Sequence, residues 1–132
     1  MDFNFTEDQI AIRELAYQIF TDRATDEFML AFSRSGETYD DDLWATLAEQ
    51  GLLGIAVPES AGGSGLGLVE LCMVLEEQGR RVAPVPLYAS LVLGGLPIAQ
   101  FGNADQQSRW LGALAAGEAK FSAAIAELGM SS

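Results

Sequence analysis

Histidine is absent from this 132-residue sequence, and cysteine occurs once, as Cys72. Without histidine, Ser-His and Cys-His nucleophile pairs cannot form within the chain. The usual zinc ligand sets cannot be assembled either, so we predict no metal site. A lone cysteine excludes an intramolecular disulfide. Because Cys72 stands in an apolar helical stretch, we expect it to be a small buried side chain.

Basic residues and long apolar runs are also scarce. The sequence has 7 lysines and arginines against 19 acidic residues, which gives a formal net charge of −12. Such a surface repels phosphate backbones and anionic lipid headgroups, so we expect no nucleic-acid partner and no binding to a membrane surface. No apolar run reaches the roughly 18 residues of a membrane span. The opening MDFNF lacks the basic region of a signal peptide, and we expect a reducing, cytoplasmic setting.

Helical periodicity is what the sequence does contain. Thr6 and Gln9 have the spacing of a capping box, in which each side chain bonds the other residue's backbone amide at the start of a helix. Apolar residues then recur on one helical face, at Ile12, Leu15, Ala16, Ile19 and Phe20. Asn103 and Gln106 repeat the cap spacing. Gly51 has the position of a left-handed residue that ends a helix in a Schellman motif.

Further helices are expected over residues 68–79 and after the extended VAPVP link, with Pro97 ending or kinking the latter. The fold class is therefore all-α, an up-and-down-like bundle of five to six helices, with Trp44 and Trp110 packed at helix faces. Residues 120–128 alternate as a strand would. A single strand leaves its backbone groups unpaired. We therefore predict a helical domain over 1–119 and, over 120–132, the first β-strand of a following domain.

The stretch GLLGIAVPESAGGSGLG, residues 51–67, places a glycine-rich loop between an apolar run and a helix, the order of a nucleotide-binding unit. It does not contain the Gly-x-Gly-x-x-Gly spacing of dinucleotide-binding loops or the Gly-Lys-Ser/Thr of a P-loop. Glu59 and Glu70 flank the loop, and no basic residue lies between Arg34 and Arg80. We therefore interpret the glycines as a tight reversal that joins two helices and holds no phosphate.

Several motifs in order make this chain similar to the N-terminal helical domain of the acyl-CoA dehydrogenases. They are Phe5-Thr6-Glu7, Glu49 to Leu52, Val57-Pro58-Glu59, Gly62-Gly63-Ser64-Gly65, Glu76-Glu77-Gln78-Gly79, Pro97-Ile98 and FGNADQQSRWLGALAAGE. Each motif is weak alone, and together they span essentially the whole chain. The resemblance implies the front part of an FAD-dependent enzyme that oxidises an acyl-CoA to the trans-2-enoyl-CoA. It also implies an electron acceptor such as an electron-transfer flavoprotein.

The resemblance places the catalytic base in a C-terminal part that this sequence does not contain, so we assign no catalytic residue and expect this part alone to be inactive. It implies that the helix after VAPVP lines the acyl pocket, through Leu87, Tyr88 and Leu91. Packing in the core is the alternative for these three side chains.

The resemblance also implies flavin contacts in the first strand, at Ile125, Ala126 and Ser132. Ala126 replaces the family's threonine, and Leu128 replaces its proline. These departures suggest a backbone-only contact or a diverged subunit. Two other functions stay open: a non-catalytic helical interaction module, and an inactive pseudo-enzyme subunit of a heteromer. A homo- or hetero-oligomer is expected.

Overall fold

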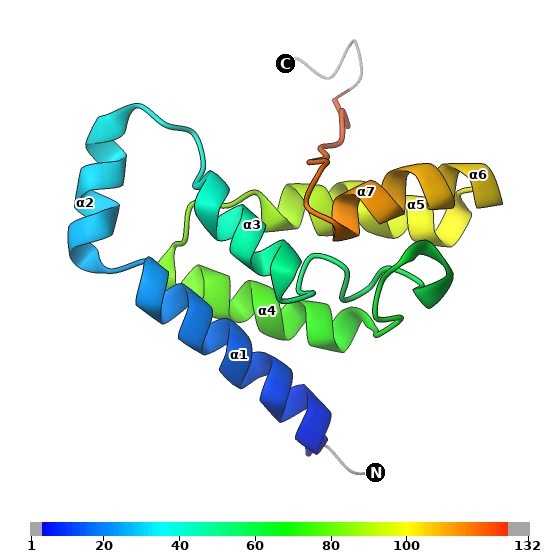
Figure 1. The fold of residues 1–132 in the computed structure, drawn as a ribbon, viewed down its shortest axis with the longest axis horizontal. Helices are drawn as coiled ribbons and strands as arrows, with labels where there is room; N and C mark the ends of the chain where they lie inside the picture. Colours follow the sequence, from blue (N-terminus) through cyan, green and yellow to red (C-terminus); the bar gives the residue numbers. More distant parts are fainter. Residues whose placement is uncertain (1–3, 127–132) are drawn as a thin grey trace.

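The computed structural model describes residues 4–126 and confirms an all-α fold (Figure 1). The helices are α1 (Glu7–Arg23), α2 (Asp26–Ser35), α3 (Asp41–Glu49), α4 (Leu68–Arg81), α5 (Leu96–Phe101), α6 (Ala104–Gln106) and α7 (Gly112–Ala115). A π-helical segment, η2 (Tyr88–Gly95), runs directly into α5, and a second, η3 (Gln107–Leu111), joins α6 to α7. A short 3₁₀ turn, η1 (Glu59–Ala61), lies between α3 and α4.

The helix ends follow the sequence signals. The Thr6–Gln9 and Asn103–Gln106 capping boxes are both formed. Gly51 has φ of +75° after α3. The amide of Leu52 donates to the carbonyl of Leu47, which is the long-range bond of the predicted Schellman motif.

Helices α1 and α4 lie side by side and run in the same direction (Figure 1). At their N-terminal ends the Gln9 amide donates to Glu70 over 2.7 Å, and farther along Arg13 pairs with the buried Glu77 at 3.3 Å. The up-and-down arrangement is therefore wrong for this pair. After α2 the chain comes back beside the end of α1, where Arg23 pairs with Asp40, and α3 with the loop of residues 50–67 then returns it to the starting end of α1 (Figure 1).

Pro97 neither ends nor breaks its helix. The amide of Leu96 donates to the carbonyl of Leu91, five residues back, and the helix continues to Phe101. Proline clashes with the carbonyl four residues before it in regular α-helix. The wide π-type turn ahead of Pro97 rearranges those carbonyls, which explains why a helix-breaking residue is tolerated here.

Trp44 is buried, and Trp110, which is 40% exposed, packs edge to face against Phe121. Both tryptophans therefore pack as predicted.

Two other expectations need correction. Cys72 is exposed, because the buried side of α4 includes Leu71, Val74 and Glu77 instead. No strand forms within residues 4–126, so the described part of the expected strand has no regular secondary structure. A strand needs a partner for its backbone groups.

Candidate functional site

The glycine-rich loop folds back on the chain that precedes it. The amides of residues 62–66 all donate to carbonyls of residues 54–59, for example Ser64 to Gly54 at 2.9 Å. Gly63 packs so closely that a Cβ atom would overlap Val57. These amides are therefore already satisfied, whereas a phosphate site needs backbone N–H groups that point outward.

The next amide along the chain is also occupied, and by a negative charge. Gly67 N–H donates to Glu70 at 2.9 Å, and the Gln9 hydrogen bond is the main cause that holds the pKa of the Glu70 carboxyl below its ordinary value. An ionised carboxylate therefore stands at the N-terminus of α4, where a bound phosphate would have to lie. The loop serves as the predicted reversal.

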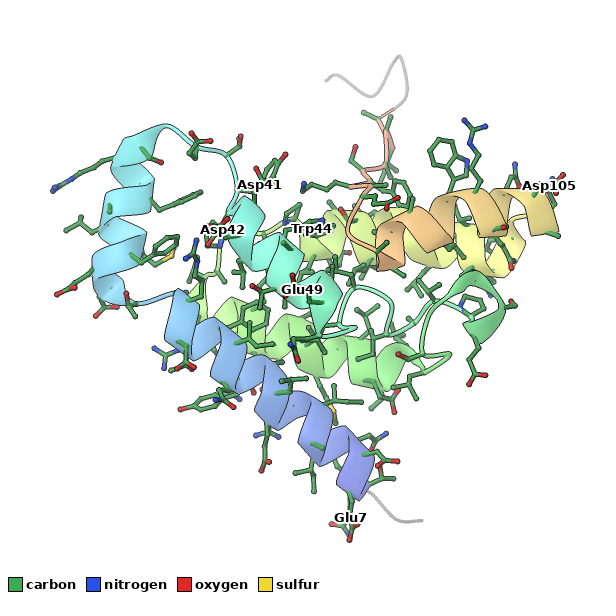
Figure 2. All side chains as sticks on the ribbon, viewed as in Figure 1. Glu7, Asp41, Asp42, Trp44, Glu49 and Asp105 are labelled. Atoms are coloured by element: carbon green, nitrogen blue, oxygen red, sulfur yellow. The ribbon has the colours of Figure 1, made fainter. Side chains whose placement is uncertain are left out.

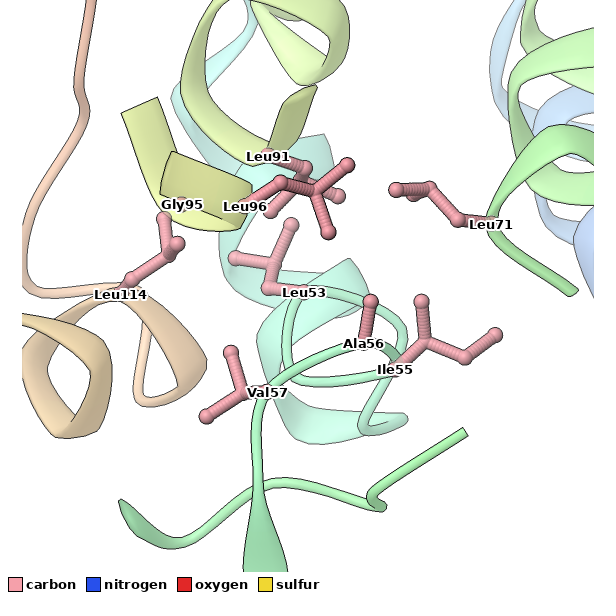
Figure 3. A pocket seen from close by; sticks show the side chains of 9 residues that line it. All are labelled: Leu53, Ile55, Ala56, Val57, Leu71, Leu91, Gly95, Leu96 and Leu114. Carbon is pink, nitrogen blue, oxygen red and sulfur yellow. The ribbon is translucent and has the colours of Figure 1, made fainter. Parts of the chain in front are cut away.

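An apolar cavity lies behind this loop, between the loop, α4 and η2 (Figure 3). It is lined by Leu53, Ile55, Ala56, Val57, Leu71, Leu91, Gly95, Leu96 and Leu114. Its volume is about 10 Å³, the space of about one water molecule. Ligand pockets occupy roughly 300–1,000 Å³. Within residues 4–126 this is a packing void, so an acyl slot would need a second wall from elsewhere.

The three predicted acyl-wall residues are not brought to one surface. Leu87 is fully buried in the core, and Leu91 is buried and lines the cavity of Figure 3. Tyr88 is 59% exposed. Leu91 therefore borders the apolar cavity, and Tyr88 lies on the surface. Leu87 packs in the core, the alternative considered for these side chains.

The chain after α7 is fastened to the bundle at several points. The indole of Trp44 donates to the carbonyl of Gly117 at 3.0 Å. Lys120 pairs with Asp41 at 3.2 Å, and its ammonium lies 4.5 Å from the centre of the Tyr39 ring. Figure 2 shows Trp44 and Asp41 on α3, from which they hold this segment.

Phe121 is held most closely. The Ser90 hydroxyl donates to the Phe121 carbonyl at 3.2 Å and accepts from the Phe121 amide at 3.0 Å. The Phe121 ring meets Trp110 edge to face, with centroids 6.2 Å apart. Gly94 leaves the room for Phe121, since a Cβ there would overlap the Phe121 Cβ. We call Ser90, Gly94 and Trp110 the Phe121 socket. Sequence reasoning missed it, because a serine in an apolar run gives no sign of a partner 31 residues away.

The predicted flavin contacts lie just beyond this anchor. Ile125 is 68% exposed, and Ala126 is exposed. Their side chains are apolar, so an incoming flavin could meet their backbone groups and their methyl surface only. Ile125 and Ala126 therefore fit a flavin contact through the backbone, without side-chain hydrogen bonds. Ser132 and Leu128 lie outside the described residues.

The described residues form one helical domain, and its last segment is held on η2 through Ser90. Residues 6–118 match the family described as acyl-CoA dehydrogenase, N-terminal domain. This chain therefore belongs to the acyl-CoA dehydrogenase family, as the motifs predicted.

Individual relatives agree with this assignment. Acyl-CoA dehydrogenase FadE27 of Mycobacterium tuberculosis is 34% identical over 110 residues, which are 83% of this chain and 30% of FadE27. The structure of the Tcur3481-Tcur3483 steroid ACAD variant is 47% identical with a TM-score of 0.86, over 94% of this chain and 34% of that one. The ChsE4-ChsE5 complex from M. tuberculosis gives 32% identity and a TM-score of 0.85, over 92% and 34%. The chain thus spans about a third of the length of these relatives.

Proposed function

We propose that this chain is the N-terminal domain of an FAD-dependent acyl-CoA dehydrogenase that oxidises an acyl-CoA thioester at its α,β-carbons. The observation that carries the proposal is the match over residues 6–118 combined with the anchored segment 117–121. That segment is held on η2, the helix that bears Leu91, by the two hydrogen bonds between Ser90 and Phe121.

In this proposal the chain contributes surface rather than chemistry. Leu91 presents an apolar side chain that would exclude water from the acyl group, and the exposed Tyr88 ring would border the same slot from its rim. The backbone of Ile125 and Ala126 would contact the cofactor. FAD, when bound, supplies the oxidising power by accepting a hydride from the acyl β-carbon. No carboxylate of the described residues is assigned the role of base, which would come from a later domain.

The test compares two proteins from the same source: the 132-residue chain, and the uninterrupted coding sequence that contains it. We expect the chain alone to be colourless and unable to reduce an electron acceptor with acyl-CoA. The longer protein should be yellow and active, with an electron-transfer flavoprotein as its natural acceptor. A yellow, active 132-residue chain would contradict the proposal that FAD binding and catalysis need residues outside this chain. A longer protein that neither holds FAD nor oxidises acyl-CoA would contradict the proposed activity.

A second candidate is a non-catalytic subunit of a heteromeric dehydrogenase. Two observations favour it: Ala126 and Leu128 depart from the family's flavin motif, and one solved relative is a complex of two differently named chains, ChsE4 and ChsE5. Native mass spectrometry with flavin quantification separates the two. One FAD per copy of this chain supports the catalytic role, and a complex whose flavin count equals only the partner's copies supports the second.

Cytoplasmic location is also a proposal. Cys72 is a free thiol in the described residues, which suits a reducing compartment. Among residues 4–126, no helix is both long and apolar enough to cross a bilayer.

A further inference from the structure

Ser90 is a fully buried polar residue inside an otherwise apolar π-helical segment. Its hydroxyl has both of its hydrogen bonds directed at one residue, Phe121, from which it accepts the amide N–H and to which it donates at the carbonyl. Two bonds to the two ends of one residue fix its orientation as well as its position. Apolar packing alone would hold Phe121 against η2 without a buried polar group. The two hydrogen bonds of Ser90 therefore specify the backbone orientation of Phe121.

The other two socket residues, Gly94 and Trp110, restrict the position of the Phe121 side chain. Gly94 lies so close beneath Phe121 that any side chain there would displace it. Trp110, from η3, closes the aromatic side with its ring plane at 79° to that of Phe121. Both Ser90 and Trp110 stand on π-helical segments, which occur frequently at functional sites.

The socket stands between the two sets of predicted contacts. Ser90 directly precedes Leu91, the proposed acyl-wall residue, which lines the small apolar cavity. Phe121 lies four residues before Ile125, a distance of at most about 14 Å along an extended chain. The Ser90–Phe121 hydrogen bonds therefore connect η2, which would face the acyl chain, to the segment after Phe121, which would face the flavin.

We propose that Ser90 and Gly94 are positioning residues that align the flavin-facing backbone of Ile125 and Ala126 with the acyl wall at Leu91. This inference rests on the proposed function. It predicts that loss of the socket weakens FAD binding without a matching loss of overall stability.

The test uses the full-length protein with Ser90→Ala, which removes both hydrogen bonds at little change in volume, and Gly94→Ala, which displaces Phe121. Val74→Ala is the matched control, since Val74 is a fully buried core residue on α4 outside the socket. Three quantities are measured for each variant: the melting temperature, hydrogen–deuterium exchange of peptides covering residues 117–126, and the Kd for FAD added to the apoprotein.

We expect both socket variants to exchange faster over 117–126 and to bind FAD about tenfold more weakly, a change of about 1.4 kcal/mol in binding free energy. The control should lower the melting temperature at least as much but leave the Kd near that of the unaltered protein. Faster exchange with an unchanged Kd would overturn the positioning role and leave the proposed function intact. A control that weakens FAD binding as much as Ser90→Ala would also overturn it, because general destabilisation would then explain the effect. Unaltered protein with no FAD binding at all would overturn both proposals.

Discussion

Trp44 Nε1 donates a 3.0 Å hydrogen bond to the carbonyl oxygen of Gly117, 73 residues farther along the chain. The bond joins the buried face of α3 to the turn that ends α7, where Gly117 has φ of +78°. Trp44→Phe keeps an aromatic ring but removes the donor and leaves the carbonyl without it. We expect the free energy of unfolding to fall by about 1–3 kcal/mol, measured by urea denaturation of this chain. An unchanged urea midpoint would show that the contact does not hold the turn in place.

Acid should weaken the link between α1 and α3. Asp40 is buried, and the Arg23 guanidinium donates to it at 2.6 and 2.8 Å. These bonds are the main cause that holds the pKa of the Asp40 carboxyl below its ordinary value of 3.8. Because the pKa is depressed in the folded state, the stabilisation is complete above the unfolded pKa and is lost as the pH falls through the folded one.

The free energy of unfolding should therefore decline as the pH drops below about 4. Asp40→Asn should be less stable than the unaltered chain at pH 7 by about 1.5–3 kcal/mol, and the two should converge in acid. The exposed Asp105, on α6, provides the control substitution Asp105→Asn, which should leave the free energy of unfolding at pH 7 near that of the unaltered chain. If the Asp40→Asn and unaltered curves stay parallel into acid, the ion pair is not the origin of the pH dependence.

Val82 has a strained backbone conformation, and a substitution by glycine should remove that strain. It has φ of 52° after α4 and is 75% exposed, so a β-branched side chain occupies the left-handed position usually taken by glycine. Such strain costs about 1–3 kcal/mol. Val82→Gly should raise the thermal midpoint, whereas Val69→Gly, at an exposed position inside α4, should lower it. A lower midpoint for Val82→Gly would mean that the valine side chain makes a compensating contact.

The glycine loop should not recognise nucleotides. Its amides are committed to carbonyls of residues 54–59, and Glu70 occupies the adjacent helix start. Isothermal titration of this chain with ATP, NAD or CoA should therefore give no binding heat. Micromolar binding that Gly65→Val abolishes would reverse this interpretation.

Local signals in the sequence predicted the local structure well. The Thr6 cap and the Gly51 stop depend on residues within five positions of each other, so their spacing is sufficient evidence. The exposure of Cys72 and the parallel pairing of α1 with α4 depend on which surfaces meet. Periodicity does not contain that information.

At the candidate site, too, single residues could be predicted from the sequence, but contacts between residues distant in the chain could not. Leu91 was predicted from a family resemblance and lines the apolar cavity. Ser90 and Phe121 were not predicted as partners, because a hydrogen bond across 31 residues leaves no local pattern.

Anaerobic titration of the longer protein with acyl-CoA thioesters of increasing length, following the visible absorption of the oxidised flavin, is the decisive test of the proposed acyl-CoA oxidation. We expect an acyl-CoA to bleach this absorption in a single turnover without any added acceptor. Leu91→Phe, which enlarges a side chain of the proposed acyl wall, should shift the preferred thioester to a shorter chain. A flavin-loaded protein whose absorption no acyl-CoA bleaches would contradict the proposed acyl-CoA oxidation, as would a longer protein that holds no flavin.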